Sequence, residues 1–155
     1  MKALLLLLLV GAAGAPVVEK RPPTQSLRWE SDGCEGESIA VVSGCPSHQS
    51  APFVIRLRMA KALVIPSHSH PVDENVTVLR GELLFHLLSD TAPPTVVRLK
   101  QGDFFRIPAY TFHIAEAIED TEIQTNGIGP LVTTWAKDRC KATATPATLP
   151  TGCAP

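Results

Sequence analysis

The feature that most constrains the fold is a succession of short runs rich in Val, Ile, Leu, Phe and Thr, broken at intervals by Gly, Pro, Asp and Ser. No run has a clean helical period, and runs of this length and composition are typical of β-strands. In the run from Phe53 to Met59, apolar residues alternate with Arg56 and Arg58, which is the period of two of a strand with one buried face. The pattern predicts about ten strands, at residues 38–42, 53–59, 63–65, 75–79, 82–88, 95–99, 103–107, 112–117, 122–128 and 131–135. Strands at this spacing predict an all-β sandwich or barrel.

Residues 1–15 have the order of a secretory signal peptide. Lys2 precedes six leucines from Leu4 to Leu9, and small residues follow up to Ala15. The apolar run is about half the length of roughly 20 residues that a membrane-spanning helix needs. Cleavage can follow Ala13 or Ala15. We therefore expect an exported protein, periplasmic or secreted, that has no membrane association after cleavage.

The rest of the chain divides into three parts by composition. Residues 16–28 include Pro22-Pro23 and predict an extended lead-in. Residues 29–140 hold all the predicted strands and form one domain of ordinary size. Residues 141–155 form a tail rich in Thr, Ala and Pro. The formal net charge of −1 and the scattered Lys and Arg residues exclude the basic footprint of a nucleic-acid or anionic-membrane binder.

Four cysteines, an even number, favour two disulfides in an exported chain. They are Cys34, Cys45, Cys140 and Cys153. Three pairings are possible, and the sequence leaves the choice among them open. A zinc site made from these thiols is the weaker interpretation, because spacing such as C-x2-C is missing.

The informative triplet is His68-Ser69-His70. On a strand, residues two apart point to the same face, so both imidazoles can share one ion. Glu74 follows after the bend at Pro71, and its carboxylate can return to the same point. Neutral imidazoles with a carboxylate suit one divalent transition metal ion: Fe, Mn, Ni, Cu or Zn. His113 is the fourth candidate ligand.

These residues belong to two longer motifs that resemble those of the cupin superfamily. The motifs are His68-x-His70-x3-Glu74-x6-Gly81 and Gly102-x5-Pro108-x4-His113. The chain resembles small single-domain bacterial cupins from about Trp29 to Trp135. The resemblance implies a conserved barrel, also described as a jelly roll or double-stranded β-helix. It also implies that His68, His70, Glu74 and His113 are the metal ligands. Dimerisation through an exposed sheet is common in the superfamily, so a homodimer is compatible with the resemblance.

Three positions depart from the family pattern. Ala62 and Tyr110 stand where the motifs have glycine, and Ala117 stands where the second motif ends in asparagine. None of these positions is a metal ligand in the family, so the predicted site survives the departures. Because of them, the turn near Tyr110 and the polarity of the pocket near Ala117 can differ from the family pattern.

Few other residues offer chemistry near such a site. His86 either lines the pocket as an acid, base or substrate contact, or it faces solvent or packs. Its run is apolar on both faces, so the sequence does not assign its direction. Asp73 either orients an imidazole or lies exposed in a turn. Tyr110 either closes the pocket mouth or packs. Trp29 and Trp135 bracket the domain, and we expect them to seal the core.

Two functions fit this pattern. The first is a metal-dependent enzyme, dioxygenase-like or isomerase/lyase-like, that acts on a small organic substrate. In that case Glu74 is the candidate catalytic base, as the resemblance to quercetinase-like cupins implies. The alternative is a non-catalytic module that binds a small ligand or the metal itself. Because only His86, Asp73 and Tyr110 are available as extra titratable groups, the second function stays open.

Overall fold

The computed structural model describes residues 26–31 and 34–136. These described residues form ten strands, as the sequence predicts. They are β1 (Glu37–Gly44), β2 (Pro52–Met59), β3 (Val64–Ser69), β4 (Glu74–Arg80), β5 (Glu82–Leu87), β6 (Thr95–Lys100), β7 (Phe104–Ile107), β8 (His113–Ala117), β9 (Thr121–Ile128) and β10 (Thr134–Trp135). The predicted signal peptide, the tail, Cys140 and Cys153 lie outside the described residues. Within the part of the chain that the structure describes, no helix has the length and hydropathy of a membrane-spanning segment.

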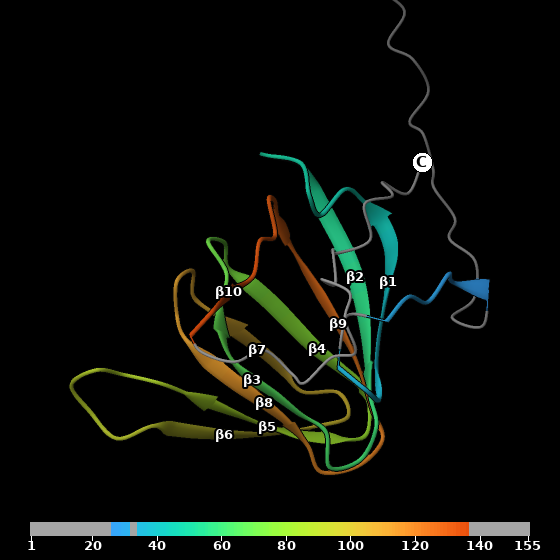
Figure 1. The fold of residues 1–155 in the computed structure, drawn as a ribbon. Coiled ribbons are helices and arrows are strands. Elements are labelled where there is room, and N and C mark those ends of the chain that lie inside the picture. Colours follow the sequence, from blue (N-terminus) through green and yellow to red (C-terminus); the bar gives the residue numbers. More distant parts are fainter. Residues whose placement is uncertain (1–25, 32–33, 137–155) are drawn as a thin grey trace, which may run out of the picture.

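The strands form two five-stranded sheets that face each other (Figure 1). The strand order is β1-β2-β9-β4-β7 in the first sheet and β10-β3-β8-β5-β6 in the second. Every pairing between named strands is antiparallel. The architecture is therefore the all-β jelly roll that the sequence predicts.

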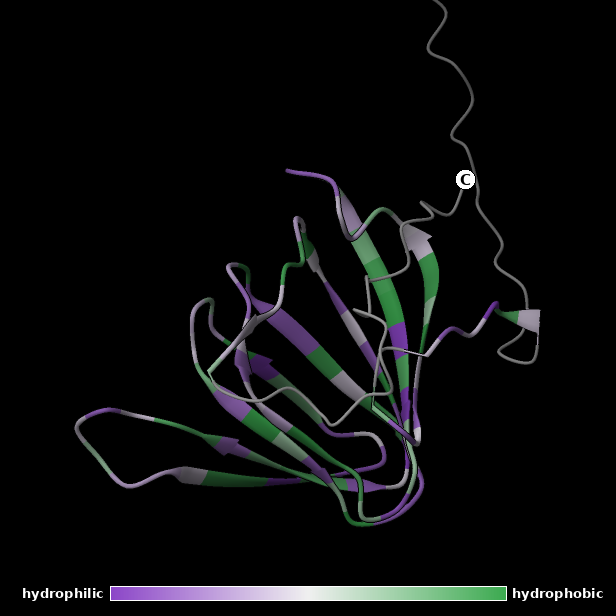
Figure 2. Ribbon diagram, in the orientation of Figure 1, coloured by the Kyte–Doolittle hydropathy of each residue, from purple (hydrophilic) through white to green (hydrophobic). Residues whose placement is uncertain are grey.

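Alternation along the strands turns one face of each sheet inward, and Figure 2 shows hydrophobic and hydrophilic residues interleaved along the strands. In β2, Ile55 and Met59 are buried and Leu57 packs against the core, whereas Arg56 and Arg58 face outward to Glu122. The predicted period of two is confirmed in this strand. The same rule on the other strands produces the apolar layer between the sheets.

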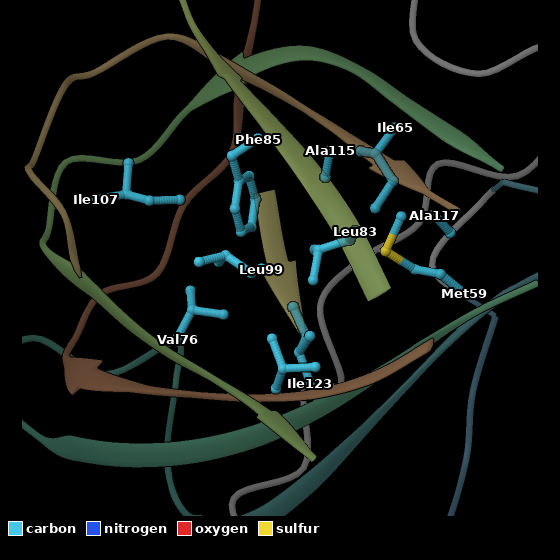
Figure 3. Packing of buried hydrophobic residues seen from close by; sticks show 11 residues of the cluster. Met59, Ile65, Val76, Leu83, Phe85, Leu99, Ile107, Ala115, Ala117 and Ile123 are labelled. Carbon is cyan, nitrogen blue, oxygen red and sulfur yellow. The ribbon is translucent and has the colours of Figure 1, made fainter. Parts of the chain in front are cut away.

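The main core contains side chains from both sheets, and Figure 3 shows them pointing toward one another. Its buried members are Met59, Ile65, Val76, Val78, Leu83, Phe85, Leu99, Ile107, Ala115, Ala117 and Ile123. Burying a Val, Leu, Ile, Phe or Met side chain contributes about 1.5–3 kcal/mol. A second cluster of Ile39, Phe53, Ile55 and Leu131 lies beside β1 and β2.

Two strands differ from the predicted boundaries by more than two residues. β3 does not end at Ile65 but continues to Ser69, with an irregularity between Ile65 and His68. Pro66 has no N–H to donate to the ladder, which suits a bulge at this point. The last strand is shorter than predicted, because residues 131–133 leave the ladder: Leu131 N donates to Pro46 O (2.7 Å) and Val132 O accepts from a histidine ring.

Neither described cysteine is a free thiol, and both Cys34 and Cys45 are buried. Cys45 Sγ also lies 3.6 Å from Ser47 Oγ. Because the other two cysteines lie outside the described residues, the pairing of the disulfides stays a prediction.

Candidate metal centre

The bulge in β3 decides which way His68 faces. Ile65 points into the core and pairs with Ala115 of β8. In a regular strand, His68 would then point outward, since a shift of one residue reverses the face. The irregularity restores an inward direction, and His68 pairs directly with His113. Both imidazoles are therefore buried between the sheets.

The other two candidate ligands lie where the chain crosses from one sheet to the other. His70 follows the end of β3, and Glu74 is the first residue of β4 in the opposite sheet. Pro71 bends the chain between them. The centre thus receives side chains from both sheets.

The three imidazoles and the carboxylate converge. The histidines each offer a ring nitrogen, and these nitrogens lie within 4.8 Å of one another. Glu74 Oε2 lies 3.5 Å from His70 Nε2 and 3.5 Å from His113 Nε2. Atoms that each bind one metal at about 2.1 Å are about 3–4 Å apart, so small side-chain movements suffice to place a cation among these donors.

Backbone carbonyls orient all three imidazoles. His68 Nδ1 donates to Pro66 O (2.7 Å), His113 Nδ1 to Thr111 O (3.0 Å) and His70 Nδ1 to Val132 O (3.1 Å). A carbonyl oxygen only accepts hydrogen bonds, so the proton of each neutral ring is on Nδ1. The Nε2 lone pairs are left for a metal, which is the arrangement that metal-binding histidines usually have.

Burial sets the protonation of the centre. It lowers the pKa of His68 from 6.5 to about 3, with the charge of His113 as a smaller cause, and the pKa of His70 from 6.5 to about 4. Burial also lowers the pKa of His113, against the attraction of Glu74. The rings are therefore neutral at pH 7, as metal ligands must be. Burial raises the pKa of Glu74 from 4.5 to about 6.

This donor set fits a divalent transition metal. Three neutral imidazoles and one carboxylate suit Fe, Mn, Ni, Cu or Zn, and do not discriminate among them. The histidines are held by the backbone before any ion arrives. The structure brings together all four residues that the sequence singles out, and their role as ligands is taken up below as a proposal.

A cavity of about 70 Å³ opens beside the centre. Its wall consists mainly of aliphatic side chains from both sheets, with Phe85 and Trp135 as the aromatic members. The ring of Phe85 also meets the ring of His113 in an edge-to-face contact with centroids 5.8 Å apart. The hydrophobic core and the candidate centre are therefore continuous.

Some residues of this site were not found from the sequence. Trp135 does not only seal the core: its ring lies 5.1 Å from that of His68 and lines the cavity. Glu37, Thr125 and Thr133 also line it. No motif marks them, because tertiary packing of segments distant in the chain brings them to the cavity. Trp29, in contrast, stacks under the guanidinium of Arg58, 3.8 Å away.

The three extra titratable groups proposed from the sequence do not line the cavity. His86 alternates with the buried Leu83 and Phe85, and its Nε2 pairs with Glu116 Oε2 at 3.2 Å. Tyr110 is 73% exposed, so it does not close the cavity.

Asp73 orients a loop rather than an imidazole. Its Oδ1 accepts a hydrogen bond from Ala109 N (2.8 Å), and its Oδ2 lies 3.4 Å from Arg106 Nη1. One residue later, Tyr110 N donates to His70 O (2.7 Å). These two bonds join the loop before His113 to the turn that carries His70 and Glu74.

Comparison with known proteins finds the same fold. The family model described as cupin domain matches residues 56–125. KdgF from a Halomonas species is 20% identical with a TM-score of 0.59, and the match covers 72% of this chain and 94% of that one. An RmlC-like cupin from Shewanella frigidimarina is 17% identical with a TM-score of 0.57, over 72% and 93% of the two chains.

Oxalate decarboxylase from Bacillus subtilis is a more distant match. It is 12% identical with a TM-score of 0.60, over 79% of this chain and 33% of that one. Another structure of that enzyme concerns its Mn(II) centres. No curated protein matches the chain at the level of sequence. At these identities the solved structures show a shared fold alone.

Proposed function

Because the chain belongs to the cupin superfamily, we propose that it is an exported metal-binding protein that acts on a small organic substrate. The proposed metal ligands are the Nε2 atoms of His68, His70 and His113 and the carboxylate of Glu74. The observation that carries the proposal is the convergence of these four groups in the wall of a largely apolar cavity. Metal-dependent relatives such as the Mn(II)-containing oxalate decarboxylase support it.

The proposed reaction is dioxygenase-like or isomerase/lyase-like. When bound, the metal would supply Lewis acidity to an oxygen of the substrate and would leave coordination positions open. The chain itself would orient the ligands through the three backbone carbonyls and exclude water through the apolar wall.

Glu74 is the proposed acid–base group. Its Oε2 faces the Nε2 atoms of two histidines, and burial raises its pKa to about 6. A carboxylate with a pKa near neutrality can both accept and return a proton, since neither direction is strongly uphill. In this role Glu74 would leave the metal, so that its carboxylate could take a proton from the substrate and hold it.

One observation favours the alternative, a binding module without chemistry. Of the groups that could assist Glu74, His86, Asp73 and Tyr110 all lie outside the lining of the cavity. Among the described residues, only Glu37 adds a titratable side chain to that wall. A site with so few acid–base groups can capture a ligand on a metal without turning it over.

Both functions require a metal bound at the proposed centre, so the metal content of the purified protein tests both. The chain should be purified without a His tag, and its metal measured by mass spectrometry. We expect about one divalent ion per chain, and at least a tenfold loss in His70→Ala. His86→Ala is the matched control, because it removes a histidine on the outer face. Equal metal content in His70→Ala and the unmodified protein would end the proposal.

Turnover separates the enzyme from the binding module. Protein loaded with Fe, Mn or Ni should be assayed for oxygen uptake and product formation with phenolic, thiol and keto-acid substrates. Turnover that is lost in Glu74→Gln while the metal is retained supports the enzyme. Thermal stabilisation by a substrate without turnover supports the binding module.

Export and disulfides belong to the same proposal. The leader at residues 1–15 predicts export, and the absence of a free thiol at Cys34 and Cys45 suits an oxidising compartment. Fractionation of cells that express the full chain, followed by mass spectrometry, should find a form that begins at residue 14 or 16, outside the cytoplasm. A full-length cytoplasmic form would contradict export.

A further inference from the structure

The cavity beside the proposed centre is walled by hydrocarbon. Its aliphatic members come from both sheets and include Ile39, Ile55, Leu57, Ile65, Val76 and Ile123. Such a wall stabilises apolar groups by removing them from water. It offers no hydrogen bond to a ligand.

The polar part of the wall is small. Apart from the four proposed ligands, the polar side-chain groups of the described lining residues are the hydroxyls of Thr125 and Thr133, the indole N–H of Trp135 and the carboxylate of Glu37. None of the described lining residues is Lys or Arg. The cavity wall described here therefore carries no positive charge until a metal binds.

The basic residues near the barrel face other partners. Arg56 and Arg58 reach Glu122 on the outer face of the first sheet. Arg98 and Lys100 pair with Glu82. These ion pairs lie outside the cavity lining, so their cations do not compensate a charged ligand inside it.

This distribution disfavours ligands with two anionic groups. One carboxylate can bind the metal, but a second would be buried against hydrocarbon and near Glu37. A buried charge without a counter-ion is strongly unfavourable, and a buried hydroxyl without a partner also costs affinity. Each such group should weaken binding by about tenfold or more.

We infer that this cavity binds a short aliphatic monocarboxylate, with its carboxylate at the metal and its branched hydrocarbon end against the aliphatic wall. Dicarboxylates and polyhydroxylated acids are the ligands it rejects. The inference rests on the proposed metal centre and names the substrate class of that site. The cavity is small, about 70 Å³, which favours a short ligand over a long one.

Two pairs of probes of equal shape test the inference. 4-Methylpentanoate differs from succinate in that an isopropyl group replaces a carboxylate. 2-Methylbutanoate differs from glycerate in that two methyl groups replace hydroxyls. Binding of each probe to Co(II)-loaded protein would be measured by calorimetry and by the change in the visible spectrum of cobalt. We expect the aliphatic member of each pair to bind at least tenfold more tightly.

Variants of the wall supply the controls. Leu57→Ala removes a lining side chain and should weaken the binding of 4-methylpentanoate by about three- to tenfold. Leu79→Ala is the matched control, because Leu79 does not line the cavity and should leave binding unchanged. Thr133→Arg adds a cation to the wall, so it should reduce the preference for 4-methylpentanoate over succinate by at least tenfold. Melting curves would confirm that each variant is folded.

The outcomes separate the two proposals. If Co(II) does not bind, the proposed function fails and this inference fails with it. If Co(II) binds but succinate or glycerate binds as tightly as its aliphatic partner, the inference alone is overturned.

Discussion

Two residues at the motif positions adopt a backbone conformation that favours glycine. Ala62 has a φ of 67° and Tyr110 a φ of 61°, and both stand where the cupin motifs have glycine. The family turns are therefore kept although the glycines are gone. A residue with a Cβ pays about 1–2 kcal/mol for this left-handed conformation.

Ala62→Gly should stabilise the protein. The relief of about 1–2 kcal/mol exceeds the extra entropy that glycine loses on folding, about 0.5–1 kcal/mol. Urea denaturation should show a gain of about 0.5–1 kcal/mol in the free energy of unfolding. Ala60→Gly is the control, because Ala60 has no positive φ and should lose stability. A loss of equal size in both variants would contradict the argument.

The two motif glycines should respond differently to alanine. Gly81 and Gly102 both have positive φ, 80° and 92°. A Cβ on Gly81 would lie 2.4 Å from Asp120 O, whereas a Cβ on Gly102 meets nothing within 4 Å. We expect Gly102→Ala to cost about 1–2 kcal/mol and Gly81→Ala at least twice as much. Chemical denaturation measures both, and equal losses would refute the steric part of the explanation.

At the scale of elements, the loop between β7 and β8 positions His113. Its backbone is tied to the preceding turn by Ala109 N with Asp73 Oδ1 and by Tyr110 N with His70 O. The loop before His113 and the turn that carries His70 are therefore fixed relative to each other by groups that do not themselves bind the metal. Removing such a partner typically lowers the metal affinity by about 10–100-fold.

Asp73→Ala should weaken metal binding by about tenfold. Asp73→Asn should bind nearly as well as the unmodified protein, because its side-chain oxygen can still accept from Ala109 N. Competition with a metal chelator measures both affinities. Arg106→Ala should have little effect, since its ion pair with Asp73 is exposed. Asp73→Asn failing as severely as Asp73→Ala would show that the charge matters instead.

β10 places an optical reporter beside the centre. Trp135 pairs with His68, and its ring lies 5.1 Å from that imidazole. Binding of Co(II) or Cu(II) should therefore quench the fluorescence of Trp135. Trp135→Phe should abolish most of this quenching, and Trp29→Phe should retain it, because Trp29 packs on Arg58. If the quenching were instead lost in Trp29→Phe, the metal would bind elsewhere.

At the scale of the whole molecule, the centre lies at the junction of the two sheets. His68 and His113 come from one sheet and Glu74 from the other. Cross-sheet packing therefore builds the site, and a bound metal would in turn hold the sheets together. Any ligand that binds only the folded chain raises its stability.

Acid should destabilise the metal-free protein. Unfolded histidines bind protons near pH 6.5, but native His68 and His70 do so only at about 3 and 4. Stability is thus lost as the pH falls below 6.5. Glu74 has the opposite effect on stability between about pH 6 and pH 4.5. Because its pKa is raised in the folded state, its protonation stabilises the folded protein as the pH falls. The histidines dominate, so we expect a net loss of about 3 kcal/mol from pH 7 to 4.5.

Urea denaturation in the presence of a chelator measures this loss. Glu74→Gln should steepen it, because the opposing titration disappears, and His86→Ala should leave it nearly unchanged. A metal-free protein as stable at pH 4.5 as at pH 7 would show that the imidazoles are not buried in their neutral form.

The amino-acid sequence alone determined the strand content and which residues meet. Alternation in β2 predicted its buried face, and the spacing of His68, His70, Glu74 and His113 predicted their convergence. These are local properties, since they follow from period and from motif spacing. The sequence also marked Ala62 and Tyr110 as departures, although it did not reveal that both keep the glycine conformation.

Only the tertiary structure decided how the site is finished. The bulge after Ile65 turns His68 inward, the Val132 carbonyl orients His70, and Trp135 joins the cavity wall. His86 faces away because its neighbours on β5 fill the core. These outcomes depend on pairing between segments distant in the chain. No local pattern encodes such pairing, because it is set by how the two sheets pack together.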